Sequence, residues 1–476
     1  MAFDRFLCGS ALVMSLGLAC ATPVSAQGWE IETSLDVIDA PQTRIEGLHR
    51  LYIGHRFSET FSFGQGIYSA VLGDAGGAFF WGFEGVAHLP LTDRLGLSFS
   101  GFYGGGGGAA QVIGDGTMLR AGASLDYRLS PHWDLQLTAA YLRIQGAPID
   151  GATYGLGFRY RTDAAGAMSG GGMPEFDAIS LQATHMRAPS GTRTRPGAPQ
   201  PAVSLVGVRA MFNLTPNSQL WFSGAGAADG AQGYMQLMGG ARYSVPLGRA
   251  TLFAEGGLGL AGGGNVDTGA GAIVTAAIGA AMPVSRNIDV ELSLGGIASV
   301  DGPYRAATLS LGVTRHFGRD GGTGEGQRWA YTGGFQLQDA GAGFYLAPAG
   351  RDSVVAMQES SFDYFLGRRS YVTGSALTTV GGGVAGYALG MVGFGYEIPL
   401  NDRWSVSVEG LLGAAGGGGV NTAGGIVGAA RVEVDYRVGA NWRLSMGLGQ
   451  MATLRSGGMQ PATLSLGVKI PFVTHR

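Results

Sequence analysis

Apolar and polar residues alternate along many short segments of this chain. Residues 442–448 carry apolar side chains at every second position, at Trp442, Leu444, Met446 and Leu448. Residues 431–438 alternate in the same way, and their polar positions are Arg431, Glu433, Asp435 and Arg437. A period of two residues is typical of a β-strand with one apolar face. The pattern therefore predicts strands.

The alternating segments follow one another along nearly the whole chain after residue 26. We predict about 24 strands of roughly 10 to 14 residues each. The connections alternate between tight turns, such as PLTDR, PLGR and PLND, and longer glycine-rich stretches, such as GGGGGAAQVIGDG, AGGGNVDTGA and GGGGVNTAGG. Such a chain of hairpins predicts an antiparallel, up-and-down, all-β fold with its short turns gathered at one end.

The strand pattern occurs three times. Three similar closing segments, TYGLGFRY, TLSLGVTRHF and TLSLGVKIPF, contain Gly157, Gly312 and Gly467, and each of these glycines lies 155 residues after the one before it. We therefore divide the chain into repeat units at residues 27–164, 173–318 and 325–473, with about eight strands in each unit. This period is far longer than the period of a solenoid repeat.

The composition indicates what surrounds these strands. The chain has 476 residues, of which 87 are glycine and only 14% are charged. One face of the predicted strands is apolar, and the other is mostly Gly, Ala and Ser with a few charges of both signs. A soluble sandwich would need many charged residues on its outer face. An apolar outer band around a weakly polar interior instead fits a transmembrane barrel.

The N-terminus is typical of a secretory signal peptide over residues 1–26. Arg5 supplies the positive charge, an apolar core follows it, and Ala26 ends a small-residue cleavage site. A second interpretation is a lipoprotein that is acylated at Cys20. Cleavage after Ala26 would remove Cys8 and Cys20, the two cysteines of the chain, so we expect no disulfides in the mature protein.

With these features together, the chain resembles Gram-negative outer-membrane β-barrel proteins. Its last predicted strand, TLSLGVKIPF, is similar to the C-terminal assembly signal of that class, although VTHR follows the aromatic Phe472. The resemblance implies an outer-membrane location and contact with outer-membrane lipid. It also implies that the barrel-assembly machinery inserts the chain. With an even number of strands, both termini are expected on the periplasmic side.

Two architectures fit the repeats. In the first, all strands form one wide transmembrane barrel of about 24 strands, whose lumen is open or plugged. In the second, each unit closes on itself to give three tandem eight-stranded barrels with filled interiors. We expect the single wide barrel, because duplicated strands can extend one sheet without leaving additional edges.

The alternation also places a set of charged side chains on the inner face. The predicted inward-facing polar cluster consists of Glu255, Glu409, Arg431, Glu433, Asp435, Arg437 and Arg443. Glu255 and Glu409 recur at equivalent places, with Ser100 at the same place in the first unit. These groups would either line a pore or neutralise one another in a packed core.

No motif indicates catalysis. The glycine runs lack the helix and lysine of a phosphate-binding loop, and no nucleophile has a matching base. His49 and His55 share one strand face, but we expect neither a metal nor a cofactor. The net charge of −3 gives no basic surface for nucleic acid.

We expect a non-enzymatic conduit, either a passive pore or an export channel for a surface polymer that works with periplasmic partners. A structural or surface-interaction protein is the alternative, and an outer-membrane enzyme is the least favoured.

Overall fold

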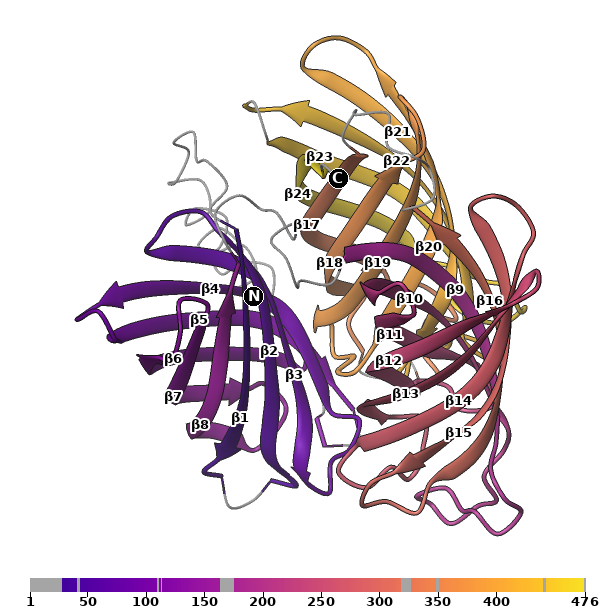
Figure 1. The fold of residues 1–476 in the computed structure, drawn as a ribbon, viewed down its shortest axis with the longest axis horizontal. Coiled ribbons are helices and arrows are strands. Elements are labelled where there is room, and N and C mark those ends of the chain that lie inside the picture. The colour runs from indigo at the N-terminus through magenta and orange to yellow at the C-terminus, as the bar shows by residue number, and fades with distance from the viewer. Residues whose placement is uncertain are drawn as a thin grey trace.

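The computed structural model describes residues 28–40, 43–108, 111–112, 114–162, 175–317, 327–347, 351–439 and 442–474. They form 24 antiparallel strands that close into three separate eight-stranded barrels (Figure 1). The predicted signal peptide lies outside the described residues. Within the described part of the chain, no helix is long and apolar enough to cross a membrane.

Each barrel consists of eight consecutive strands. Barrel 1 contains β1 (Trp29–Ile38), β2 (Ile45–Arg56), β3 (Phe61–Gly73), β4 (Phe79–Pro90), β5 (Leu95–Gly107), β6 (Thr117–Arg128), β7 (Trp133–Ile144) and β8 (Ile149–Arg161). Barrel 2 contains β9 (Glu175–Arg187), β10 (Val203–Thr215), β11 (Ser218–Asp229), β12 (Met235–Leu247), β13 (Ala250–Gly262), β14 (Ala272–Pro283), β15 (Ile288–Ser299) and β16 (Arg305–His316). Barrel 3 contains β17 (Gln327–Asp339), β18 (Val354–Phe365), β19 (Ser370–Gly381), β20 (Ala388–Pro399), β21 (Trp404–Gly416), β22 (Ile426–Arg437), β23 (Arg443–Thr453) and β24 (Ala462–Thr474).

The predicted strand number and the all-β antiparallel fold are confirmed, but the single wide barrel is wrong. The first strand of each unit pairs with the last strand of the same unit: β1 with β8, β9 with β16 and β17 with β24. The second architecture, three barrels of eight strands, is therefore the one that the chain adopts.

Charged side chains inside each unit explain why the units close separately. Arg120 on β6 donates to Asp36 on β1 at 2.9 Å, and Arg431 on β22 donates to Glu359 on β18 at 2.5 Å. These pairs span the barrel interior between strands that are not neighbours. Only a narrow barrel brings opposite walls within reach of two side chains. A lumen enclosed by 24 strands would separate these partners.

Each barrel has a base, where the connections are short, and a tip, where most are longer. In barrel 1 the base turns span residues 57–60, 91–94 and 129–132, and the tip connections include residues 74–78 and 108–116. Trp133 and Trp404 begin strands at the base with 47% and 44% of their surface exposed. Exposed aromatic residues at this height are typical of the girdle at a membrane interface.

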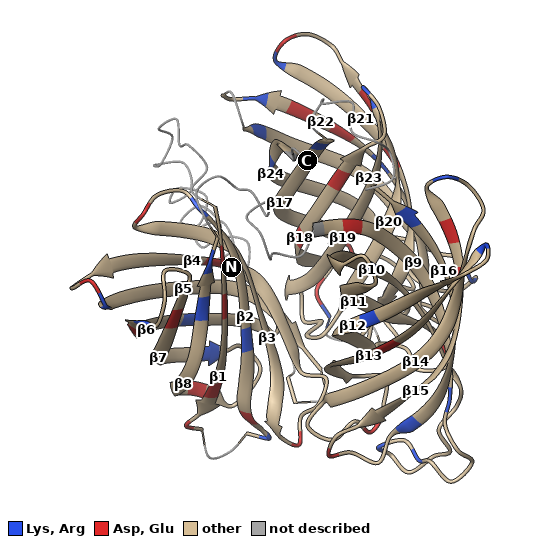
Figure 2. Cartoon of the chain, in the orientation of Figure 1, with Lys and Arg blue, Asp and Glu red and all other residues tan. Residues whose placement is uncertain are grey.

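The outward faces of the strands are apolar along most of their length. Exposed outward side chains include Leu156 on β8, Leu292 on β15 and Leu448 on β23. Charged residues are sparse on all three barrels, and most of the ribbon carries none (Figure 2). This distribution is the reverse of a water-soluble barrel, whose outer face would be polar.

Barrels 1 and 3 pack closely against each other through their outward faces. Phe83 of barrel 1 meets Phe335 of barrel 3 edge to face, with 5.9 Å between the ring centroids. Beside them, Gln65 donates from Nε2 to the Tyr331 hydroxyl at 2.6 Å, and the Tyr331 and Ser360 hydroxyls lie 3.2 Å apart. Hydrogen bonds between outward polar residues can hold membrane-embedded elements together where apolar contact with lipid would otherwise compete.

Barrels 2 and 3 also meet at the base. The ring of Phe317, just after β16, lies 4.4 Å from the ring of Tyr364 on β18. Trp329 on β17 lies close to both rings. The aromatic group therefore joins the base of barrel 2 to the base of barrel 3.

We predict that Tyr331→Phe lowers the free energy of unfolding by about 0.6 to 1.7 kcal/mol, because it leaves the Gln65 amide without its acceptor between two barrels. The measurement is equilibrium unfolding in detergent micelles. Tyr154→Phe, at a position 59% exposed on the outer face of barrel 1, is the matched control and should change stability by less than about 0.5 kcal/mol. Equal effects of the two substitutions would contradict the role of the Gln65 bond.

Candidate functional site

The upper interior of barrel 3 is organised around one arginine. Arg431 on β22 donates to Glu359 on β18 and to Glu409 on β21, at 2.5 Å in both cases. Tyr371 on β19 donates to the second oxygen of Glu409 at 2.7 Å. All four side chains are buried. Since an unpaired charge in such an interior is costly, the group is stable only while it remains complete.

A second group lies nearer the base of barrel 3. Lys469 on β24 is paired with Glu433 and lies 3.2 Å from Asp435. Arg443 donates to Glu397 at 2.5 Å, and its guanidinium lies 3.9 Å from Asp435. The two groups lie in the middle and the base half of the barrel 3 interior, and an apolar cluster that includes Phe344, Met357 and Tyr387 fills the tip half.

Barrel 1 has a larger network of the same kind. Arg159 on β8 contacts Glu32 at 2.5 Å, Asp126 at 2.8 Å and Asp134 at 3.4 Å. Arg50 on β2 contacts Glu32 at 2.7 Å and Glu84 at 2.8 Å. Every one of these side chains is at least nine-tenths buried. The interior of barrel 1 is consequently occupied from wall to wall.

Barrel 2 uses fewer charges. Glu255 on β13 accepts from Arg209 and Arg242, each at 2.8 Å. Arg242 also contacts Glu291 at 2.9 Å. At the base, His316 lies between two carboxylates, with Nδ1 2.9 Å from Asp177. An apolar cluster that includes Trp221, Tyr234 and Met238 packs in the same interior.

The predicted polar cluster is divided between two barrels. Glu409, Arg431, Glu433 and Asp435 are buried in barrel 3, and Arg443 is largely covered beside them. Glu255 lies in barrel 2 with its own arginines, so Glu255 and Glu409 face separate interiors. Arg437 is exposed at the base end of β22. The predicted set therefore does not form one continuous lining.

Sequence reasoning missed most of the partners of these residues. The missed partners with buried or mostly covered side chains are Glu32, Asp36, Arg50, Glu84, Arg120, Asp126, Asp134, Arg159, Arg209, Arg242, Glu291, Glu359, Glu397 and Lys469. The alternation could have found many of them. In β1, for example, the segment WEIETSLDVI carries Glu30, Glu32, Ser34 and Asp36 at every second position, all facing inward.

The histidines on β2 point outward. His49 is bonded to Thr33 on β1 at 2.9 Å, and His55 packs against the ring of Trp29. Among the described residues, no group of three or more His, Cys, Asp or Glu side chains is arranged to hold a metal ion.

The tips of the three barrels meet through equivalent glycines. Phe79, Met235 and Ala388 begin β4, β12 and β20, and in the sheet they pair with Gly107, Gly262 and Gly416 respectively. The loops just before these strands contain Gly77, Gly233 and Gly386, whose φ angles are 89°, 83° and 80°. The shared pairing and shared backbone conformation identify the same structural positions in the three barrels.

These glycines contact one another in a ring. A Cβ added to Gly77 of barrel 1 would lie 2.5 Å from the backbone nitrogen of Gly263 in barrel 2. A Cβ on Gly233 would lie 3.1 Å from Gly417 of barrel 3, and one on Gly386 would lie 3.1 Å from Gly108 of barrel 1. Each barrel thus uses its loop to touch the strand end of the next. The result is a pseudo-threefold apex within a single chain, which resembles a closed cyclic trimer.

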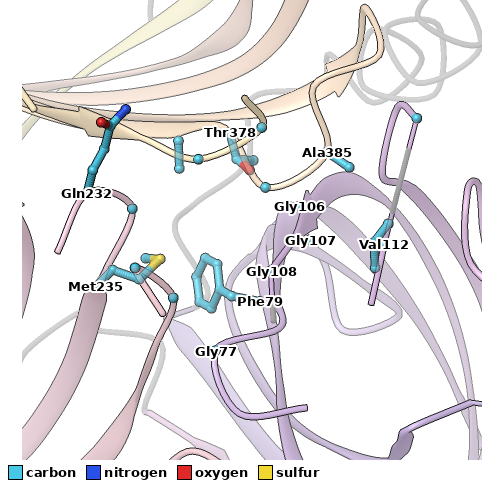
Figure 3. Close-up of a pocket in the computed structure, with 18 of the residues that line it drawn as sticks. Gly77, Phe79, Gly106, Gly107, Gly108, Val112, Gln232, Met235, Thr378 and Ala385 are labelled. Atoms are coloured by element: carbon cyan, nitrogen blue, oxygen red, sulfur yellow. The ribbon is translucent and has the colours of Figure 1, made fainter. Parts of the chain in front are cut away.

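The apex surrounds a partly open cavity of about 340 Å³ (Figure 3). All three barrels line it, mainly with glycine backbone, and Phe79 and Met235 lie beside it. Gln232 also lines the cavity and donates across the apex to the carbonyl of Val420 at 3.1 Å. The size is near the lower limit for a small-molecule site.

Two buried tyrosines support the apex from below. Tyr234 and Tyr387 end the equivalent tip loops of barrels 2 and 3, and Tyr387 donates to Gln338 at 3.2 Å. Burial raises the pKa of both hydroxyls. They therefore remain neutral, and they pack in the apolar caps of their barrels.

No known protein family and no curated protein matches the chain. Solved structures similar to it include OccK11 (OpdR) of Pseudomonas aeruginosa, at 10% identity over 94% of this chain and 95% of that one, with a TM-score of 0.23. The copper transporter OprC is 11% identical over 95% of this chain and 81% of that one, with a TM-score of 0.30. The siderophore receptor PirA of Pseudomonas aeruginosa is 11% identical over 93% of this chain and 79% of that one, and its TM-score is also 0.30. The chain resembles Gram-negative outer-membrane β-barrel proteins at the level of the class, and no strand or site of this chain is matched to one of theirs.

We predict that Arg431→Met lowers the free energy of unfolding by about 3 to 5 kcal/mol, because it leaves Glu359 and Glu409 as uncompensated buried charges. Arg437→Met, on the same strand but exposed, should change stability by less than about 0.5 kcal/mol. Equilibrium unfolding in micelles measures both. A small effect of Arg431→Met would show that water or another cation compensates the two carboxylates.

We predict that Gly77→Ala destabilises the apex more than Gly457→Ala does. Both glycines have nearly the same φ, 89° and 87°, so both variants carry a backbone cost of about 1 to 2 kcal/mol. The two positions differ in the space for a Cβ. A Cβ added to Gly457 would have no atom within 4 Å, whereas a Cβ added to Gly77 would clash with the backbone of barrel 2. The rate at which a protease cleaves the tip loops should therefore rise in Gly77→Ala and stay unchanged in Gly457→Ala. Equal protease sensitivity would contradict the glycine ring.

Proposed function

We propose that this chain is a non-enzymatic outer-membrane protein in which three filled barrels act as a membrane anchor. The glycine apex would then be the surface that the protein presents outside the cell. The observation that carries the proposal is that buried paired charges and an apolar cluster together occupy each barrel interior. Arg159 and Arg431 each bind carboxylates from more than one strand, so paired side chains lie across the interiors of barrels 1 and 3.

The membrane assignment is supported by the outward faces. Bands of leucine, valine and isoleucine surround each barrel, and exposed tryptophans lie at the base of barrels 1 and 3. Closed sheets satisfy their backbone hydrogen bonds without water, as a lipid environment requires. Short base turns and longer tip connections match the periplasmic and outer sides of this class. Export through the predicted signal peptide, insertion by the barrel-assembly machinery and contact with outer-membrane lipid belong to the same proposal.

The surface-interaction role is favoured over the conduit because of barrel size. A passive pore or a polymer export channel that works with periplasmic partners was expected for one wide barrel. Eight strands leave space for side chains and little more. The apex, in contrast, combines residues from all three barrels around one cavity, and such a shared site requires the three barrels to be held together.

Catalysis has no support in the site. The apex is lined mainly by glycine backbone, with Arg351 and Gln232 as its ionisable or amide side chains. A nucleophile with an adjacent base is needed for hydrolytic chemistry. We therefore propose binding rather than turnover at the apex.

Conductance across a planar bilayer tests the proposal. The refolded mature chain should insert into the bilayer and should give no reproducible conductance step. A shift in its gel mobility on heating reports that the chain is folded. The reason is that eight-stranded barrels filled by paired charges and apolar side chains leave no room for a water-filled path.

A reproducible step from the inserted chain would overturn the filled-barrel function. Glu409→Gln serves as the matched variant in that case. A change of ion selectivity in Glu409→Gln would place the conducting path inside barrel 3, whereas unchanged selectivity would place it elsewhere in the molecule.

A further inference from the structure

The hairpin connections differ in charge between the two ends of the barrels. In the described connections at the base, the charged residues are six exposed arginines, Arg94, Arg249, Arg286, Arg368, Arg369 and Arg403, and three acidic residues, Glu59, Asp93 and Asp402. In the described connections at the tips they are five arginines, Arg44, Arg193, Arg195, Arg351 and Arg455, and six aspartates, Asp39, Asp74, Asp115, Asp267, Asp301 and Asp352. The base connections therefore carry an excess of positive charge, and the tip connections do not.

The arginines at the two ends also differ in their partners. At the tips, Arg44 is paired with Asp74, and Arg455 lies 3.2 Å from Asp229. None of the six base arginines forms an ion pair with another residue that the structure describes. An exposed guanidinium without a partner in its own chain keeps its donors free for an external anion.

Exposed arginines follow one another along the base of barrel 3. The backbone nitrogen of Glu397, near the base end of β20, donates to the carbonyl of Arg369 at 2.8 Å. The next base turn, residues 400–403, follows β20 directly, and the backbone nitrogen of Arg437 donates to the carbonyl of Arg403 at 2.8 Å. Neighbouring backbone thus connects Arg368, Arg369, Arg403 and Arg437, which are all exposed. We call these four residues the basic rim.

The carboxylates near the basic rim do not neutralise it. Glu397 is largely covered and accepts from Arg443 at 2.5 Å, so its charge is already compensated inside the barrel. Arg328 lies 3.7 Å from the same carboxylate and adds a further, half-exposed cation beside the rim. Asp402 is the one exposed carboxylate in the described base turns of barrel 3. The rim therefore presents four guanidinium groups against one exposed carboxylate.

Apolar side chains in the same turns place the basic rim at the height of lipid headgroups. Leu366 and Leu400 begin the two turns and are 52% and 61% exposed. Trp404 directly follows Arg403 and is also exposed. Tryptophan and arginine side by side are typical of a membrane interface, where apolar groups enter the bilayer and cations remain among the headgroups. A soluble acidic partner would not require exposed leucines in these turns.

We propose that the basic rim binds the phosphate groups of anionic phospholipids in the periplasmic leaflet, and so selects the lipids that surround the base of barrel 3. Guanidinium groups donate paired hydrogen bonds to phosphate oxygens. A phospholipid such as phosphatidylglycerol has a net negative charge, whereas the amine of a zwitterionic lipid offsets its phosphate. The proposal rests on the membrane location and the orientation proposed above.

Electron spin resonance of labelled lipids tests the proposal on the full mature chain. The protein is reconstituted into phosphatidylcholine vesicles with a trace of spin-labelled phosphatidylglycerol or spin-labelled phosphatidylcholine, and the ratio of the two association constants is measured. The wild-type chain should favour phosphatidylglycerol by about threefold or more, because basic side chains near the surface attract anionic lipid. The triple variant Arg368→Gln, Arg369→Gln, Arg403→Gln should show a ratio near one. About 1 M salt should lower the wild-type ratio towards one as well, because it screens exposed charges.

The matched control removes three exposed arginines from the tip end of barrel 2, in the triple variant Arg187→Gln, Arg193→Gln, Arg305→Gln. It should keep the wild-type ratio. A ratio that is unchanged in the rim variant, or lowered equally in the control, would overturn the proposal.

The wild-type chain alone also decides the question if the rim variant does not fold. A ratio of one for the inserted wild-type chain would refute the lipid site, and it is the result expected if the rim binds an acidic periplasmic protein instead. A ratio that high salt does not lower would equally refute it. Failure of the folded chain to insert would refute the membrane location itself, so the two failures are distinguishable.

Discussion

The structure depends on the compensation of charges inside narrow barrels. A closed eight-stranded sheet satisfies its own backbone, but its interior must be filled, and a buried charge is tolerated only beside its partner. Arg159 in barrel 1, Arg242 in barrel 2 and Arg431 in barrel 3 each meet two or more carboxylates. Because these contacts connect strands of one unit, they also select which strands close the sheet. The same contacts therefore favour three narrow barrels over one wide sheet.

Much of this fold could be predicted from local pattern, but the closure could not. Alternation in segments such as residues 431–438 identifies a strand and its inner face. It does not say which distant strand lies opposite. Arg431 and Glu409 could be recognised as inward-facing, yet the contact with Glu359 depends on the diameter of the barrel. Both architectures give the same alternation, so only the paired side chains across the interior distinguish them. Arg437 follows the same alternation and is nevertheless exposed, because its strand ends there.

The apex escaped prediction for a related reason. Glycine runs such as those at Gly108, Gly264 and Gly419 lie in connections between strands, as the sequence predicts. Their second role depends on the neighbouring barrel: positive φ angles and the absence of a Cβ allow backbone to touch backbone between units. A repeat considered alone carries no sign of this contact, since each glycine finds its partner in the next repeat. The pseudo-threefold arrangement is a property of the triplication rather than of any one unit.

Fusion of the three units into one chain also frees them to differ. In a trimer of identical barrels, one residue would occupy all three junctions, and the ring would be uniformly closed or uniformly open. Here Gly105, Ala414 and Leu260 occupy the same position of β5, β21 and β13, and β19 packs along β5 more extensively than β3 packs along β13. The charge networks inside the barrels can vary without affecting this outward position, because successive residues of a strand face opposite sides. The packing of the interiors and the asymmetry of the junctions thus depend on different faces of the same strands.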